Sequence, residues 1–245
     1  MEFTIRLAGV NIEVKSLYDE VYSLCRDYLV DSADATPDFS VKVLPEDIVY
    51  ERDKNRQEAE IEGIAPINYA DSYLETLAVY RKIATQILDY DTFLMHGAVV
   101  AVGEKGWLFT APSGTGKTTH LRLWLENIQG SYIVNGDKPL IHIGEEVTVF
   151  GTPWAGKEGM QKNTGVTLKG IVMLERSADN RIEQISFLEA LPVLIQQAYR
   201  PNDKAELEKT LKLIKELGRK LSFFRLSCNM EPEAAKVAYE VLNGR

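Results

Sequence analysis

The chain has 245 residues, of which 45% are hydrophobic and 26% charged, so it can form one large α/β domain or a domain with a smaller appendage. Its formal net charge of −8 argues against non-specific nucleic-acid binding, which needs an excess of Lys and Arg to displace phosphate counterions. Neither a signal-peptide h-region nor an apolar run of roughly 18 residues is present, so we expect a cytoplasmic protein without a membrane segment.

Residues 1–68 predict a small N-terminal α+β lobe. Alternating apolar residues indicate a hairpin over Phe3–Ala8 and Asn11–Val14, followed by an amphipathic helix over Leu17–Leu29 and a strand over Phe39–Val43. Dense charge of both signs over Glu46–Glu62 favours a solvated loop or an edge hairpin. No motif in this lobe indicates a particular reaction, and its role could be structural, oligomeric or substrate-presenting.

Residues 69–245 predict a second domain in which helices and strands alternate. Apolar residues at helical spacing indicate helices at Tyr69–Tyr90, His120–Ile128, Leu188–Ala198, Asp203–Leu217 and from about Glu231. Short apolar runs indicate strands at Gly97–Val102, Trp107–Thr110, Tyr132–Val134, Pro139–Ile143, Val147–Phe150, Leu168–Leu174, Ile182–Ile185 and Leu221–Leu226. We expect Ile182–Ile185 to pair antiparallel with Leu168–Leu174.

A glycine-rich stretch, Ala111–Thr119, lies between an apolar strand and a helical pattern. In such a turn, successive backbone N–H groups can surround a phosphate, a lysine can reach the outer phosphates and a hydroxyl can bind magnesium. Ala111 replaces the first glycine of the usual G-x-x-x-x-G-K-[ST] pattern. The alternative is a plain strand-to-helix connection. The stretch predicts a nucleotide-phosphate site formed by Ser113, Gly114, Thr115, Gly116, Lys117, Thr118 and Thr119, with Thr118 also on the metal.

Two predicted hairpins bring further residues to this loop. If the first turns about Glu104, paired residue numbers sum to about 208 and His96 lies opposite Pro112. If the second turns near Gly144 and Glu145, the sum is about 289 and Asp137 lies opposite Thr152. Strand ends next to a phosphate loop form the ligand crevice of an α/β sheet. Three separate segments are therefore expected to converge at one place.

Each converging residue has a functional and a structural interpretation. His96 can bind a divalent metal or accept a proton from an attacking hydroxyl, or it can be a hydrogen-bonded histidine at a strand start. Asp137 can be a direct or indirect magnesium carboxylate, or a turn former in Asn-Gly-Asp. Lys157 can meet charge on a transferred phosphoryl group, or be a surface lysine. Trp154 can stack on a substrate or hold its loop.

His120 and His142 are interpreted as structural.

At these residues the sequence resembles the C-terminal domain of the HPr kinase/phosphorylases and the nucleotide core of ATP-dependent phosphoenolpyruvate carboxykinases. The likeness runs from Met95-His96-Gly97 through the glycine-rich loop to Asp137. It looks closer still to compact HPr-kinase-like proteins of peptide-modification gene clusters, whose pattern is similar at Gly151–Lys157 and at Leu174-Glu175-Arg176. The likeness extends over most of residues 70 to 200.

The resemblance implies an α/β fold with a P-loop-containing mixed sheet of the PEP carboxykinase/HPr kinase C-terminal type. The small lobe would be residues 1–68 and the nucleotide-binding domain residues 69–245. ATP and Mg²⁺ are the implied cofactors. His96 would lie at the metal and phosphate site, and Lys117 and Thr118 would bind phosphates and metal. Asp137 would be a metal ligand or a proton acceptor. The implied partner is a peptide or small-protein substrate, and a homo-oligomer is compatible with the family.

One departure affects the chemistry. Gly136-Asp137 stands where the family has two adjacent acids, so either His96 or Asp137 would have to serve as general base. The chain is also too short for a carboxykinase, so decarboxylation is not expected. The sequence predicts a kinase that transfers the γ-phosphoryl group of ATP to a hydroxyl, that of a serine in a peptide or small protein. The alternatives are a kinase for a small alcohol or amino acid, a non-catalytic ATP-binding regulator, and a scaffold with a relic loop.

Overall fold

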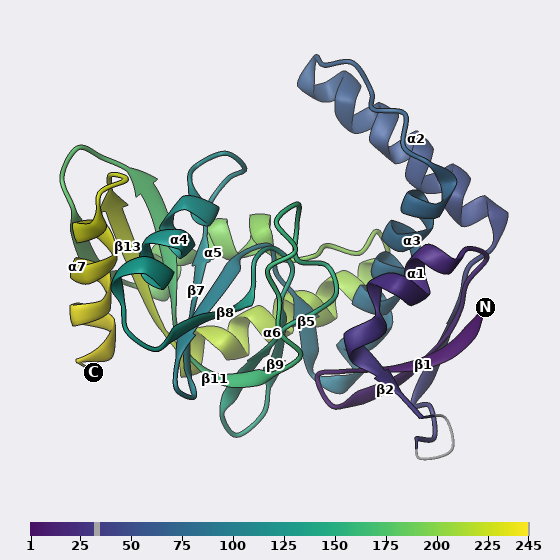
Figure 1. Ribbon diagram of the computed structural model, residues 1–245, viewed down its shortest axis with the longest axis horizontal. Helices are drawn as coiled ribbons and strands as arrows, with labels where there is room; N and C mark the ends of the chain where they lie inside the picture. The colour runs from purple at the N-terminus through teal and green to yellow at the C-terminus, as the bar shows by residue number, and fades with distance from the viewer. Residues whose placement is uncertain (32–34, 245) are drawn as a thin grey trace. The chain divides into compact units, whose positions relative to one another are not determined.

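The computed structural model describes residues 1–31 and 35–244, which divide by their contacts into two compact units (Figure 1). The first unit is Met1–Ile87 and the second is Leu88–Arg245. The sequence analysis assigned the helix that follows residue 68 to the second domain. In the structure this helix, α3 (Asp71–Gln86), packs against α1, α2 and β4 of the first unit, so the contact boundary falls after Ile87.

The first unit contains a mixed sheet with strand order β3-β1-β2-β4. The predicted hairpin is confirmed, with β1 antiparallel to β2, and β2 also pairs in parallel with β4. These strands are β1 (Glu2–Leu7), β2 (Val10–Lys15), β3 (Leu29–Val30) and β4 (Phe39–Lys42). The helix expected over Leu17–Leu29 is wrong in length. Only α1 (Asp19–Leu24) is α-helical, because the chain then forms a 3₁₀ turn and pairs with β1 as β3.

The prediction of a loop or hairpin at Glu46–Glu62 is also wrong, because this stretch is helix α2 (Pro45–Glu62). Its local signals are those of a helix. Pro45 occupies the first helical position, the Asp47 carboxylate accepts the Leu44 N–H at 2.9 Å, and Gly63 ends the helix in the left-handed conformation. Ion pairs from Arg81 of α3 to Asp47 and Glu51 attach α2 to its neighbour.

The second unit contains a larger mixed sheet with strand order β5-β9-β10-β11-β7-β6-β8. Strand β13 joins the end of β11 in parallel, and β12 pairs with β13. The strands are β5 (Thr92–Leu94), β6 (Ala98–Val102), β7 (Lys105–Thr110), β8 (Ser131–Asn135), β9 (Leu140–Ile143), β10 (Val147–Phe150), β11 (Gly165–Arg176), β12 (Arg181–Ile185) and β13 (Ser222–Cys228). Pairing of β12 with β11 was expected, and is wrong because β13 occupies that edge of β11.

Helices cover both faces of this sheet (Figure 1). On one face α4 (Lys117–Asn127) and α7 (Pro232–Asn243) bury a cluster built around Trp107, Phe109 and Trp124. On the other, α5 (Phe187–Gln197) and α6 (Lys204–Lys220) bury a mainly aliphatic cluster that also includes Phe93 and Phe223. Since strands covered on both sides must be apolar on both sides, continuous apolar runs such as Ala98–Ala101 are explained by this arrangement.

Both predicted hairpins are present, and each register differs by one residue from the expected one. Val99 pairs with Leu108 in the β6–β7 hairpin, and Val149 pairs with Ile141 in the β9–β10 hairpin. The first hairpin therefore brings His96 to the level of Ala111 instead of Pro112. Among the described residues, no helix has the length and apolar character required to cross a membrane.

Candidate functional site

The glycine-rich loop joins the end of β7 to the start of α4, as the sequence predicts. Strand β7 has β6 as an antiparallel neighbour and β11 as a parallel neighbour. Ala111 is buried at the beginning of the loop. Gly114 and Gly116 have φ angles of 76° and 120°, which residues with a side chain rarely adopt. The two glycines thus allow the chain to turn sharply before helix α4 begins at Lys117.

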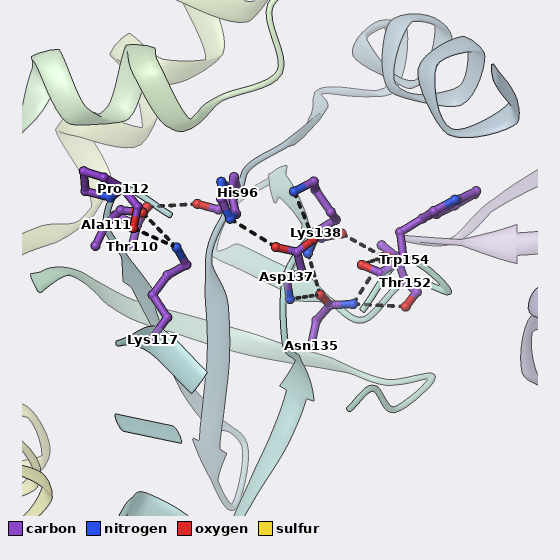
Figure 2. A network of polar contacts seen from close by, with 10 residues as sticks. All are labelled: His96, Thr110, Ala111, Pro112, Lys117, Asn135, Asp137, Lys138, Thr152 and Trp154. Carbon is purple, nitrogen blue, oxygen red and sulfur yellow. Dashed lines mark hydrogen bonds and ion pairs between the residues drawn. The ribbon is translucent and has the colours of Figure 1, made fainter. Parts of the chain in front are cut away.

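The Lys117 side chain folds back over the loop (Figure 2). Its Nζ donates to the carbonyl oxygens of Ala111 at 2.8 Å and Pro112 at 3.4 Å, and the residue is only 9% exposed. Burial lowers the pKa of Lys117, and the nearby Asp137 carboxylate opposes that shift only in part. The Lys117 ammonium is therefore held by the dipoles of two carbonyl groups instead of a direct ion pair. It can bind an anion that approaches the loop.

Arg176, at the end of β11, holds the same loop from another direction. Its Nε donates to the Thr115 carbonyl at 3.2 Å, and its terminal nitrogen donates to the Gly114 carbonyl. With Lys117 and Arg176 both bound to loop carbonyls, the loop is fixed by two cations. Sequence reasoning did not assign Arg176 to the site, because its contacts reach a loop far away in the chain and depend on the parallel pairing of β7 with β11.

His96 and Asp137 lie in contact, as the convergence of the hairpins predicts (Figure 2). The Nε2 atom of His96 is 3.1 Å from Oδ1 of Asp137, and the Lys138 ammonium is 3.0 Å from Oδ2. Burial alone would raise the pKa of Asp137, but the hydrogen bond from His96 and the charge of Lys138 together lower it. Asp137 is thus ionised at neutral pH. The sequence offered no reason to select Lys138 other than its position next to Asp137.

Buried Asn135 shapes the turn that presents these two residues. Its Oδ1 accepts the backbone N–H groups of Asp137 at 2.9 Å and Lys138 at 2.7 Å. Its Nδ2 donates to the Thr152 carbonyl at 3.0 Å, and the Thr152 hydroxyl donates to the Lys138 carbonyl at 2.7 Å. Such an arrangement is an Asx turn anchored to a neighbouring loop. The turn chemistry of Asn-Gly-Asp and the ion-pairing of Asp137 therefore coexist.

Gly136 has no room for a side chain. A Cβ atom at this position would lie 2.9 Å from the Ala155 carbonyl oxygen and 3.3 Å from that of Met160. The Gly136 N–H also donates to the Met160 carbonyl at 2.9 Å. The loop after Gly151 therefore fills the space that a second acidic side chain would need. A side chain at position 136 would therefore collide with this loop, and Asp137 is the one acid of the turn.

Replacement of Gly136 by alanine should displace this loop. Because both close atoms belong to the backbone, the loop has to move as a unit, and overpacking of this kind costs about 1–3 kcal/mol. We expect a lower free energy of unfolding in denaturant and faster tryptic cleavage after the exposed Lys157. Unchanged unfolding together with unchanged cleavage would show that the loop does not pack on Gly136.

A cavity of about 530 Å³ lies between the glycine-rich loop, the Asp137 turn and the loop after Gly151; we call it the polar cavity. All of the predicted catalytic, metal and phosphate residues except Thr115 line it: His96, Ser113, Gly114, Gly116, Lys117, Thr118, Thr119, Asp137 and Lys157. Thr115 lies on the other side of the loop, against a second cavity. Exposed Lys157 lines the polar cavity together with Glu158, which pairs with Arg122 at 2.6 Å. The polar cavity thus combines cations, the carboxylates of Asp137 and Glu158, and the backbone of the glycine-rich loop.

His120 and His142 have the structural surroundings expected from the sequence. The Nε2 atom of His120 accepts the Trp124 indole N–H at 3.0 Å within the aromatic cluster. The Nδ1 atom of His142 lies 3.1 Å from the Thr92 hydroxyl and 3.2 Å from the Tyr90 carbonyl. Neither ring is placed at the Asp137 turn.

The burial of His120 should make folding sensitive to acid. The residue is 3% exposed, and burial lowers its pKa from 6.5 to about 4. The unfolded chain therefore binds a proton at a higher pH than the folded protein, so stability is complete above pH 6.5 and falls as the pH drops towards 4. The loss amounts to about 3 kcal/mol. Urea unfolding of the parent and of His120→Asn across this range measures it. Parallel pH curves for the two proteins would contradict the assignment.

Comparisons with known proteins give a distant structural likeness and no sequence match. No model of a protein family matches the chain, and no curated protein sequence matches it. Among solved structures, the HPr(Ser) kinase/phosphatase from Coxiella burnetii is similar with a TM-score of 0.35 and 12% sequence identity. The match covers 62% of this chain and 95% of that chain.

Proposed function

We propose that the chain is an ATP- and magnesium-dependent kinase that transfers the γ-phosphoryl group to a hydroxyl, that of a serine in a peptide or small protein. The observation that carries the proposal is the meeting of two groups in the polar cavity. One is the glycine-rich loop with Lys117, and the other is the contact of His96 with Asp137. Phosphoryl transfer depends mainly on positioning and on charge stabilisation, and these groups can supply both.

In this proposal the loop holds the phosphates of ATP. Backbone N–H groups of Gly114–Gly116 and the first turn of α4 would bind the phosphate oxygens. Lys117, at the start of α4, would exchange its contacts with the Ala111 and Pro112 carbonyls for the outer phosphates. Exposed Lys157 would approach the transferred group from the opposite wall of the polar cavity.

His96 would accept the proton of the attacking hydroxyl. To donate to Asp137, a neutral His96 must carry its proton on Nε2, which leaves Nδ1 as an acceptor. Among the described residues Nδ1 has no hydrogen-bond partner. Asp137 would fix the tautomer and stabilise the imidazolium that forms when the hydroxyl loses its proton. This division of roles needs only one carboxylate at the turn, in agreement with the closed space at Gly136.

The donor set fits a magnesium ion that arrives with the nucleotide. Among the described residues no group of three or more His, Cys, Asp and Glu side chains could hold a metal by itself. Thr118 and Asp137 line the same cavity, and Mg²⁺ in nucleotide sites commonly takes one or two protein ligands while phosphates and water supply the rest. Bound there, the ion would neutralise charge on the phosphates. Each Asp137 oxygen has one polar contact, to His96 or to Lys138, and keeps a second lone pair with which it could bind the ion.

A single-turnover assay tests the proposal. The protein, in excess over ATP labelled in its γ-phosphate, is mixed with Mg²⁺ and a panel of acceptors: serine-containing peptides, free serine and small alcohols. Label on a peptide serine supports the proposal as stated. Label only on free serine or a small alcohol would show that the acceptor is a small molecule. The choice of a peptide acceptor is based on the motif resemblance alone. Absence of transfer to every acceptor would overturn the kinase assignment.

The second candidate is a non-catalytic ATP-binding regulator. It is favoured by Gly136, where the packed loop leaves the turn with a single acid. The same assay separates the two, because a regulator would be stabilised by Mg-ATP in thermal unfolding and yet transfer no label. Absence of both stabilisation and transfer would overturn both candidates.

A further inference from the structure

A second cavity lies on the other side of the glycine-rich loop from the Asp137 turn; we call it the apolar cavity. It encloses about 420 Å³ between the loop, the beginning of α4, the end of β11 and the residues that follow β13. Gly114, Gly116 and Thr119 line both cavities. A ligand that crosses the loop can therefore occupy both cavities at once.

The linings of the two cavities differ in chemistry. The polar cavity has His96, Lys117 and Asp137 on its walls. The apolar cavity has Leu174, Cys228 and Met230, beside the polar residues Glu175, Arg176, Ser177 and Asn229. Met230 is 76% exposed at the edge of the cavity, which is unusual for a large apolar side chain. Thioether groups make favourable contacts with aromatic rings. The lining thus suits an aromatic ring system rather than a phosphate.

The ring of His120 lies beside this cavity and has one buried nitrogen without a hydrogen-bond partner among the described residues. It is among the residues that line the apolar cavity, and its Nε2 accepts the Trp124 indole N–H. A neutral ring with Nε2 as acceptor carries its proton on Nδ1. This buried Nδ1 has no partner among the described residues. A buried polar group without a protein partner is commonly satisfied by a ligand or an ordered water.

We propose that the apolar cavity binds the purine nucleoside of the nucleotide, with the base against Leu174 and Met230. The phosphates would then pass over Gly114–Gly116 to Lys117 in the polar cavity. The inference rests on the proposed function, because it requires a nucleotide at the loop. It extends that function by assigning the base and phosphates to different cavities, with Arg176 anchoring the loop between them.

Affinities for ATP and for inorganic tripolyphosphate, both measured with Mg²⁺, separate the contribution of the nucleoside to binding from that of the phosphates. We expect Met230→Asp to weaken ATP binding about 10-fold while tripolyphosphate binding changes less than about twofold, since charge next to a base costs more than the lost contact alone. The matched control is Leu188→Asp at the start of α5, because Leu188 is also 76% exposed and lies outside both cavities. It should leave both affinities unchanged.

The outcomes distinguish this inference from the proposed function. If the parent protein binds neither ATP nor tripolyphosphate, the proposed function fails and the inference fails with it. If both bind and Met230→Asp leaves their ratio unchanged, the nucleoside lies elsewhere and only the inference fails. Equal weakening of ATP and tripolyphosphate would likewise overturn it, because the base would then make no separate contribution.

Protection of Cys228 gives a second test that does not depend on affinity differences. Cys228 is partly exposed and lines the apolar cavity, whereas the other cysteine, Cys25, is buried in the first unit. We expect ATP and adenosine at saturation to slow the reaction of Cys228 with a small thiol reagent at least fivefold. Tripolyphosphate should have no such effect. Equal rates with and without ATP would overturn the inference, and Cys228→Ser identifies the reacting thiol.

Discussion

Alanine at position 117 should reduce ATP-dependent phosphoryl transfer by about 10³-fold or more, the range found when a charge-stabilising group is removed from a phosphoryl-transfer or acyl-transfer site. The physical reason is the position of Lys117. Its ammonium lies at the loop carbonyls without a direct ion pair, and it is the only buried lysine among the described residues that line the polar cavity. Single-turnover transfer from labelled ATP, with ATP affinity measured in parallel, gives the effect.

The control for this variant is Lys105→Ala. Lys105 begins the same strand, β7, but is exposed at its opposite end, so transfer and ATP affinity should remain at the parent level. Burial lowers the pKa of Lys117, which means that burying its charge destabilises the fold. Removal of the ammonium should therefore not unfold the protein, and thermal unfolding checks this. Full transfer by Lys117→Ala would show that the loop does not hold the transferred phosphate.

Asparagine at position 137 should reduce transfer by about 10²–10⁴-fold, the usual contribution of a general base and of the group that orients it. The amide keeps the shape of the carboxylate and can still accept from His96, but it carries no charge to stabilise an imidazolium or to bind a metal. The same single-turnover assay measures the loss, and ATP binding without Mg²⁺ should persist. Asp179→Asn, at an exposed aspartate beyond β11, is the matched control.

Acid should also act on this residue. Because the pKa of Asp137 is lowered in the folded protein, its contribution to stability is present above its ordinary value of 3.8 and is lost as the pH falls below it. The Asn variant lacks that contribution at every pH. If Asp137→Asn transferred phosphate at the parent rate, Asp137 would have only a structural role in the turn.

The contact of His96 with Asp137 was predictable because each residue lies next to a hairpin that the local sequence indicates. A hairpin register depends on the turn between neighbouring strands, and an error of one residue still leaves each strand end at the same edge of the sheet. The contacts of Lys117 with its own loop do not follow from the motif, which indicates only a lysine that can reach a phosphate. Arg176 and Asn135 were missed because their contacts depend on which strands are neighbours and which loop packs on the turn.

Helix α2 shows a different limit of sequence reasoning. Its charges are spread over all faces, so no apolar stripe indicates a helix, although Pro45, Asp47 and Gly63 are terminal signals that the sequence contains. Apolar periodicity cannot indicate a helix that buries few apolar side chains. The closed space at Gly136, like the contacts of Arg176, depends on which segments are neighbours in the folded chain. A missing acid can be read from the sequence, but the backbone that fills its place cannot.

The pairing of β7 also determines when the site can form during synthesis. The sheet of the first unit is complete in the chain by Lys42, because its three pairings, β1 with β2, β1 with β3 and β2 with β4, all lie within that short stretch. Strand β7 and the glycine-rich loop, in contrast, gain a parallel partner only with β11, and β11 gains its own with β13. Such non-local pairings are made slowly, and a strand without its partner presents an open edge. A nascent chain therefore carries the loop without its Arg176 anchor until β11 is made, and the sheet behind that anchor closes only after Cys228.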